Sequence, residues 1–223
     1  MKEQDPTLFG KVREKLIRRK QEWAKEGRLL NDQTAELDVS ARLPPGQREV
    51  KDWPVLDLGV QPEISLEKWR LCIDGLVINP LTWDMATFLA QPQVENISDI
   101  HCVTAWSRYD NRWKGVCARH LLSVVKPLSE ASFIVFHSYD GYTTNISLAD
   151  FDNEDVLLAH SWEGKPLTCE HGGPVRVVVP KRYFWKSAKW VCRIELIGKN
   201  RPGFWEERGY HNEGDPWKEE RYG

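Results

Sequence analysis

Residues 171–180 read His-Gly-Gly-Pro-Val-Arg-Val-Val-Val-Pro, and residues 186–190 read Lys-Ser-Ala-Lys-Trp. The run Val175–Val179 predicts a buried strand, and Pro180 ends it because proline cannot donate a ladder hydrogen bond. The two glycines ahead of the strand would let the backbone approach a neighbouring group closely. This stretch therefore indicates a β-rich core with charged segments at the ends of its strands.

The same region concentrates positive charge within fourteen residues, on Arg176, Lys181, Arg182, Lys186 and Lys189. Arginine presents a planar fork that suits phosphate oxygens, and lysine adds a point charge. The pattern indicates a phosphate-binding wall beside buried strands. A solvated basic loop is the alternative that these residues alone leave open.

A second candidate for chemistry is Cys102. It follows the expected strand Ser98–Val103, so it lies where a strand meets a loop, a position that presents side chains to clefts. A thiolate there is a nucleophile or a soft metal ligand, although most buried cysteines are inert small hydrophobes. The five cysteines form no Cys-x-x-Cys pair, which argues against a disulfide framework or a zinc site. His101 should point away from whatever Cys102 faces, because side chains alternate along a strand.

The composition of the 223 residues is that of a globular protein. A net charge of −2 gives no electrostatic case for nucleic acid, and the 11 tryptophans indicate either an aromatic-walled pocket or a bulky core. No segment approaches the ~20 apolar residues of a membrane helix. The first 28 residues lack an apolar signal region, so we expect a cytoplasmic protein unless a leader was removed.

Three zones are expected along the chain. Residues 1–49 form an N-terminal helical arm and a proline-rich linker, with helical spacing over Lys11–Gly27. Packing of this arm on its own domain is favoured over a membrane-surface role. Residues 50–199 form the main domain, and residues 200–223 form a tail that should pack back because it is rich in large aromatic side chains.

The main domain has a mostly β pattern with short helices. Strands are expected at Trp69–Val77, Phe133–Phe136 and Val191–Ile197. A short helix is expected at Trp83–Leu89 with Thr82 as its cap, and the longest internal helix at Gly115–Val125.

Three stretches in order resemble the sulfite oxidase superfamily. They are Cys102–Ser107 with Trp113–Val116, then Val156–Ala159 with Gly164–Leu167, and then His171–Pro180 with Lys189-Trp190. The resemblance covers Trp69 to Ile197, and it is strongest to the small bacterial branch related to the methionine sulfoxide reductase catalytic subunit. It implies an α+β fold with a mixed, β-rich core and a molybdenum–molybdopterin cofactor.

The resemblance also implies roles for single residues. Cys102 stands where the family's cysteine sulfur binds molybdenum, and Tyr142 where a tyrosine can donate a proton, although a plain turn tyrosine is equally compatible. Contact with the pterin and its phosphate is implied for His171 and Arg176. The residues expected to hold the far end of the cofactor are Ser187, Ala188 and Lys189.

One departure concerns the substrate. Animal and plant sulfite oxidases carry an arginine shortly after the ligand cysteine, whereas this chain has Ala105, Trp106 and Ser107. The expected function is two-electron oxygen-atom transfer on a small oxyanion or an S- or N-oxide. The resemblance extends over no haem-binding domain, so a separate redox partner, a haem or flavin protein, is expected. A sulfoxide-type reductase running the reverse direction and a non-catalytic cofactor-binding domain are the alternatives.

Overall fold

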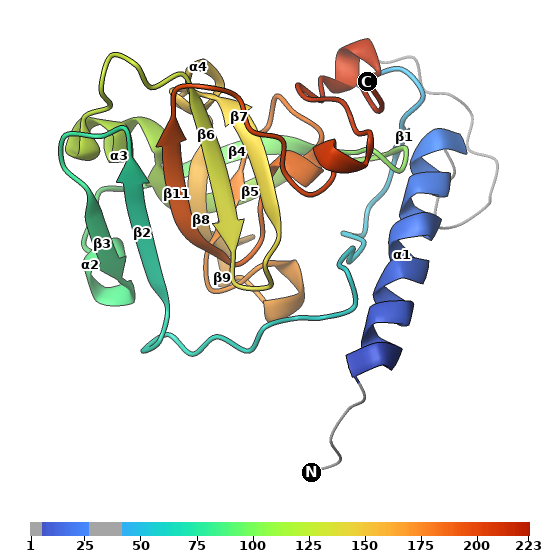
Figure 1. Ribbon diagram of the computed structural model, residues 1–223, viewed down its shortest axis with the longest axis horizontal. Helices are drawn as coiled ribbons and strands as arrows, with labels where there is room; N and C mark the ends of the chain where they lie inside the picture. Colours follow the sequence, from blue (N-terminus) through green and yellow to red (C-terminus); the bar gives the residue numbers. More distant parts are fainter. Residues whose placement is uncertain (1–5, 27–41) are drawn as a thin grey trace.

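The computed structural model describes residues 6–26 and 42–223. The first element is helix α1 (Pro6–Glu26), which lies at one side of the body beside β1 and the C-terminal turns (Figure 1). The expected arm helix ran to Gly27, which is outside the described residues. No described helix has the length and apolar character needed to cross a membrane.

Two mixed sheets form the body. In the first, the strand order is β1-β5-β8-β10, with β4 also paired to β5 and β9 to β8. Its strands are β1 (Arg48–Glu49), β4 (Gln93–Cys102), β5 (Trp106–Cys117), β8 (Leu157–Trp162), β9 (Lys165–Pro166) and β10 (Arg176–Val178). Strand β1 runs parallel to β5, and the other pairs are antiparallel.

The second sheet has the order β3-β2-β11-β6-β7, and only its β2–β11 pair is parallel. Its strands are β2 (Arg70–Gly75), β3 (Leu81–Asp84), β6 (Phe133–Ser138), β7 (Thr143–Ser147) and β11 (Val191–Ile197). The expected strand at Val191–Ile197 is confirmed residue for residue. The mixed sheets with short helices confirm the α+β prediction.

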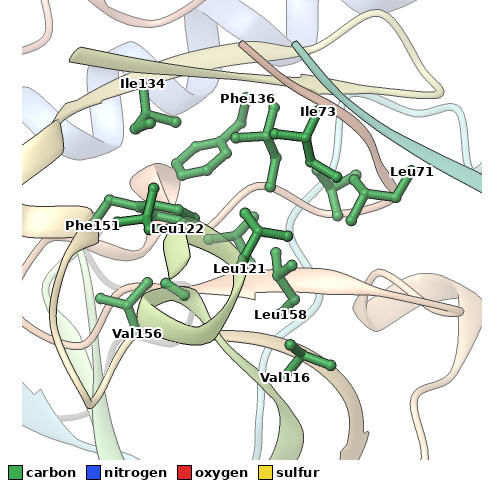
Figure 2. Packing of buried hydrophobic residues seen from close by; sticks show 14 of the residues in the cluster. Leu71, Ile73, Val116, Leu121, Leu122, Ile134, Phe136, Phe151, Val156 and Leu158 are labelled. Atoms are coloured by element: carbon green, nitrogen blue, oxygen red, sulfur yellow. The ribbon is translucent and has the colours of Figure 1, made fainter. Parts of the chain in front are cut away.

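The main hydrophobic core lies between the two sheets and the short helices α2 (Met85–Leu89), α3 (Ala118–Val125) and α4 (Leu148–Phe151). Leu71 and Ile73 alternate with the less buried Cys72 along β2, so one face of that strand enters the core (Figure 2). From the other sheet come Val116 and Leu158. Full burial of each such side chain contributes roughly 1.5–3 kcal/mol.

A second, aromatic-rich core connects the first sheet with α1 and the C-terminal tail. Trp205 and Tyr210 of the tail are buried, and Tyr210 meets Trp185 edge to face with their ring centroids 5.1 Å apart. Short 3₁₀ turns carry most of this region: η1 (Cys169–His171), η2 (Phe184–Lys186), η3 (Glu206–Arg208) and η4 (Pro216–Lys218). The tail is therefore packed on the domain.

Two expected helix starts were wrong. The helix expected from Trp83 begins at Met85, because Trp83 pairs with Leu71 in the β3–β2 ladder and the cap is Asp84, whose carboxylate accepts from Thr87 N–H at 2.8 Å. The helix expected from Gly115 begins at Ala118. Gly115 belongs to β5, where a Cβ atom would lie 2.0 Å from the carbonyl oxygen of Leu158.

Candidate active site

One cavity brings together most of the residues that the sequence singled out. About 890 Å³ of empty space, including the part open to solvent, lies between its lining residues. Six predicted site residues line it: Cys102, Tyr142, His171, Arg176, Ser187 and Lys189. Ala188 does not line it; its side chain is in the main core and its carbonyl accepts from Val177 N–H at 2.8 Å.

Cys102 is presented to the cavity by a tight turn at the end of β4. Cys102 pairs with Trp106 across the turn, and Ala105 closes it in a left-handed conformation with φ of 66°. The Cys102 side chain is 6% exposed, and its sulfur lies 3.1 Å from Thr104 Oγ1. Burial raises the pKa of the Cys102 thiol, so a metal that binds there must displace a proton.

The neighbour of Cys102 faces the other way, as expected. His101 is buried outside the cavity, with its Nδ1 2.8 Å from Ser107 Oγ. Burial lowers the pKa of His101 to about 4, so the imidazole is neutral at physiological pH. It therefore supports the turn and takes no part in the cavity.

Lys189 provides a cation in the lining of the cavity. Its ammonium donates to the carbonyl of Glu170 at 2.6 Å and lies 5.1 Å from the centre of the Trp190 ring. Burial, followed by repulsion from Arg176, lowers the pKa of Lys189 to about 7. A cation destabilised in this way gains from an anionic ligand.

Arg176 also lines the cavity, but its donors are directed at the backbone. The guanidinium donates to the carbonyls of His171 and Ser187, both at 2.8 Å, and lies over the ring of Phe184 at 4.2 Å from its centre. Burial lowers its pKa. Arg176 thus ties two wall segments together in addition to contributing charge.

Gly172 and Gly173 lie close to other segments of the chain. A Cβ on Gly172, which has φ of 101°, would lie 3.0 Å from Cβ of Lys189, and one on Gly173 would lie 2.3 Å from the Leu167 carbonyl oxygen. The glycines thereby let the His171 turn pack directly on Lys189.

The expected five-cation wall is only partly correct. Lys181, Arg182 and Lys186 lie outside the cavity. Lys186 is fully buried in an ion pair with Glu206 of the tail at 2.6 Å, and Arg182 pairs with Asp150 at 2.7 Å. Lys186 and Arg182 are therefore paired within the fold, Lys186 with the tail and Arg182 with α4.

Tyr142 lies in the cavity wall with its hydroxyl already engaged. The hydroxyl donates to the Trp185 carbonyl at 2.6 Å, and the ring is 6.0 Å from that of Phe204. Burial, reinforced by the charge of Glu206, raises its pKa well above the ordinary value. Tyr142 therefore keeps its proton at physiological pH.

Several cavity residues were not predicted from the sequence as site residues. Trp53 stacks on His171 with ring centroids 4.0 Å apart, and Lys20 reaches the cavity from α1. Lys20 donates to the carbonyl of Asp57, and burial lowers its pKa to about 8. The sequence could not predict that Lys20 lines the cavity, because the residue spacing of an amphipathic helix does not show where that helix packs.

The acidic residues in the cavity only partly balance the charges of Lys20, Arg176 and Lys189. Burial acts to raise the pKa of Asp57, but hydrogen bonds from Gln61 and Gly59 N–H and the charges of Lys189 and Lys20 outweigh it, so Asp57 stays ionised. Burial raises the pKa of Asp140. Three basic side chains, Lys20, Arg176 and Lys189, and two acidic ones, Asp57 and Asp140, line the described part of the cavity, and this excess of basic groups favours an anion.

Comparison with known proteins defines the family. A model of the oxidoreductase molybdopterin binding domain matches residues 58–205, and the chain belongs to this family. It is therefore a molybdopterin-dependent oxidoreductase. The likeness to the sulfite oxidase superfamily, expected from the motifs, is confirmed.

Individual relatives agree with this family. The chain is 45% identical over 190 residues to the uncharacterized oxidoreductase YuiH of Bacillus subtilis strain 168, covering 85% of this chain and 96% of YuiH. It is 30% identical over 165 residues to the protein-methionine-sulfoxide reductase catalytic subunit MsrP of Campylobacter jejuni. That match covers 64% of this chain but 53% of MsrP, so the chain spans only about half of that relative.

A solved structure shares the fold. The sulfane dehydrogenase SoxCD from Paracoccus pantotrophus superimposes with a TM-score of 0.58 at 23% identity, over 62% of this chain and 40% of that one. The expected sulfite-oxidase-type fold is thereby confirmed.

The cavity fits a molybdopterin group. A soft sulfur ligand, Cys102, and two cations, Lys189 and Arg176, line the same cavity, and the cations could meet a phosphate there. Trp106, which is 2% exposed, lines the cavity and its buried Nε1 has no hydrogen-bond acceptor among the described residues. A buried donor without an acceptor is costly, and a polar ligand atom would satisfy it.

Proposed function

We propose that the protein binds a molybdenum–molybdopterin cofactor through the thiolate of Cys102 and catalyses two-electron oxygen-atom transfer. The substrate class is a small oxyanion or an S- or N-oxide. Electrons pass to or from a separate redox partner, a haem or flavin protein.

The observation that carries this proposal is the shared cavity of Cys102 and the cationic pair Arg176 and Lys189. The residues come from β4, β10 and the segment before β11, and the cavity collects them although they lie far apart in the sequence. One extended ligand with a soft-metal end and an anionic end satisfies both groups.

The bound cofactor supplies the two-electron redox chemistry, and the protein binds and orients it. Cys102 provides the sulfur ligand. Lys189 supplies charge for the anionic end, and the stacked pair Trp53 and His171 forms a flat wall for a ring system. Tyr142, whose hydroxyl donates to the Trp185 carbonyl at 2.6 Å, is the proposed proton donor.

The decisive experiment measures molybdenum and releasable pterin in protein from a cofactor-competent host. We expect close to one molybdenum and one pterin per chain. Protein that carries zinc or no metal after expression with ample molybdate would contradict the proposal.

The direction of the reaction is assayed separately. The relative MsrP is named a methionine sulfoxide reductase, and this favours sulfoxide reduction as the second candidate. Dye-linked assays should compare sulfite oxidation by an electron-accepting dye with sulfoxide reduction by an electron-donating dye. The assay with the higher turnover per molybdenum shows which of the two reactions the protein catalyses better.

A further inference from the structure

Helix α1 carries one basic side chain into the cavity, although the helix precedes the matched family region 58–205. Ile17 and Ala24 are buried against the domain, at 4% and 1% exposed. Lys20 is three residues after Ile17 and four before Ala24, so all three share one helix face. The face that packs on the domain therefore points Lys20 inward.

The C-terminal tail fixes α1 in this place. The hydroxyl of Tyr222 donates to the carbonyl of Gln21 at 2.8 Å, and Gln21 Nε2 donates to the carbonyl of Arg208 at 3.2 Å. The Tyr210 hydroxyl donates to the carbonyl of Lys20 itself at 3.4 Å. The helix around Lys20 is thus held by three tail residues, two of them through its backbone.

The segment after Cys102 supplies no cation to the cavity. Residues 103–107 are uncharged, and Arg108 turns away: it donates to the carbonyl of Lys51 at 3.1 Å and lies 4.7 Å from the centre of the Trp162 ring. A small oxyanion beside Cys102 therefore needs a charge from elsewhere in the chain.

Lys20 lines the same cavity as Cys102, and Ile17 and Ala24 of its helix pack in the same hydrophobic core as Cys102. Arg221 lies outside the cavity and donates to the carbonyls of Val103 at 2.6 Å and Gly46 at 3.4 Å. Lys20 lines the cavity, and the described residues offer its ammonium one acceptor, the Asp57 carbonyl. An ammonium has three donors, so two remain for a ligand.

We propose that Lys20 binds the anionic oxygen of the substrate beside Cys102, which makes α1 a wall of the active site. This inference rests on the proposed oxygen-atom transfer at Cys102 and specifies its substrate as a small oxyanion.

The test uses cofactor-loaded protein and the variants Lys20→Met, Lys20→Gln and Lys20→Arg. Lys15→Met is the matched control, because Lys15 is on the same helix and exposed. Sulfate, which cannot be oxidised further, serves as a non-reacting oxyanion whose binding is followed by tryptophan fluorescence. Five tryptophans line the cavity: Trp53, Trp106, Trp185, Trp190 and Trp205.

Loss of the ammonium should weaken sulfate binding and raise KM for sulfite by about ten- to a hundred-fold, since a charged hydrogen bond is lost. Lys20→Arg should recover most of the binding, and Lys15→Met should match wild type. KM for neutral dimethyl sulfoxide and the molybdenum content should not change. Lys20→Gln repeats the test if the methionine variant folds poorly.

Three outcomes would overturn the inference: wild-type sulfate affinity in the Lys20 variants, no sulfate binding by the wild type, or a molybdenum content that falls with Lys20. The last would assign Lys20 to the cofactor. Each can occur while the wild type contains molybdenum and turns over, so the inference can fail while the proposed function stands. A wild type without molybdenum instead contradicts the proposed function.

Discussion

The guanidinium of Arg176 joins the turn of His171 to the segment of Ser187, with each N-to-O distance 2.8 Å. Arg176 is 1% exposed and hydrogen-bonded to two carbonyl groups. Its main role is therefore to hold the walls of the cavity in position. Its role therefore differs from that of Lys189, which makes one hydrogen bond to a carbonyl at the cavity edge.

Arg176→Ala should lower both stability and cofactor content. The change leaves two carbonyls without their donors, at a cost of roughly 2–4 kcal/mol in the free energy of unfolding. Urea unfolding of cofactor-free protein and molybdenum analysis measure the two effects. An Arg176→Ala protein with wild-type stability but low molybdenum would show that Arg176 acts on the cofactor alone.

Cys102→Ser should abolish turnover, because an alkoxide is a harder and poorer match for the metal than a thiolate. Changing Cys72, Cys117, Cys169 or Cys192 to Ala provides the controls, and each should leave most of the activity, since none lines the cavity. The measurement is turnover per molybdenum. Wild-type turnover in a metal-loaded Cys102→Ser protein would contradict the assignment.

Much of the site was predictable because its residues occur in motifs that combine composition with order. Cys102 at a strand end and the run from His171 to Pro180 indicated residues that line one cavity. Strand alternation also gave the correct orientation of His101. What the sequence could not give was which cations face the cavity, because spacing alone does not separate Lys189 from the buried Lys186.

The incorrect element boundaries have a local cause. Gly115 and Trp83 lie at positions where ladder pairing with a distant strand overrides the local helical pattern. The position of Lys20 in the cavity could not be predicted from the sequence for a similar reason. Its position depends on the packing of α1 against tail residues almost two hundred positions later in the chain.

The ion pair of Lys186 and Glu206 should make the tail essential for stability. Glu206 is 2% exposed and also accepts from Trp185 Nε1 and Thr144 Oγ1, both at 2.9 Å. Lys186→Met leaves a buried carboxylate without its cation and should cost about 3–5 kcal/mol in urea unfolding. The double change with Glu206→Gln should recover part of the loss. Additive losses in the double variant would show that the pair is not coupled.

Tyr142→Phe tests the proposed proton donor. Loss of a general acid should reduce turnover per molybdenum by about a hundred-fold or more, with cofactor content unchanged. Steady-state kinetics with metal analysis provide the measurement. If the variant keeps the wild-type rate and only loses stability, the hydroxyl serves the Trp185 carbonyl and not the reaction.

Lys189 should give the cofactor-free protein a specific dependence of stability on pH. Its pKa is about 7 in the folded protein, compared with 10.5 ordinarily, so between these values the unfolded chain binds the extra proton. The free energy of unfolding should therefore rise with pH across this window. Lys20 contributes a similar slope from about pH 8. The difference between wild type and Lys189→Met isolates the part that comes from Lys189.

We expect Lys189→Met to be stabilised relative to wild type at pH 6, where the buried cation is fully charged, and this advantage to shrink as pH rises from 7 to 10.5. Urea unfolding at fixed ionic strength measures it. In cofactor-loaded protein the anionic end of the ligand should restore the ordinary pKa of Lys189, because an opposite charge favours the protonated form. The pH-dependent difference should then disappear. A difference that is independent of pH without cofactor would contradict the lowered pKa of Lys189. A difference that is unchanged by the cofactor would remove Lys189 from the cofactor site.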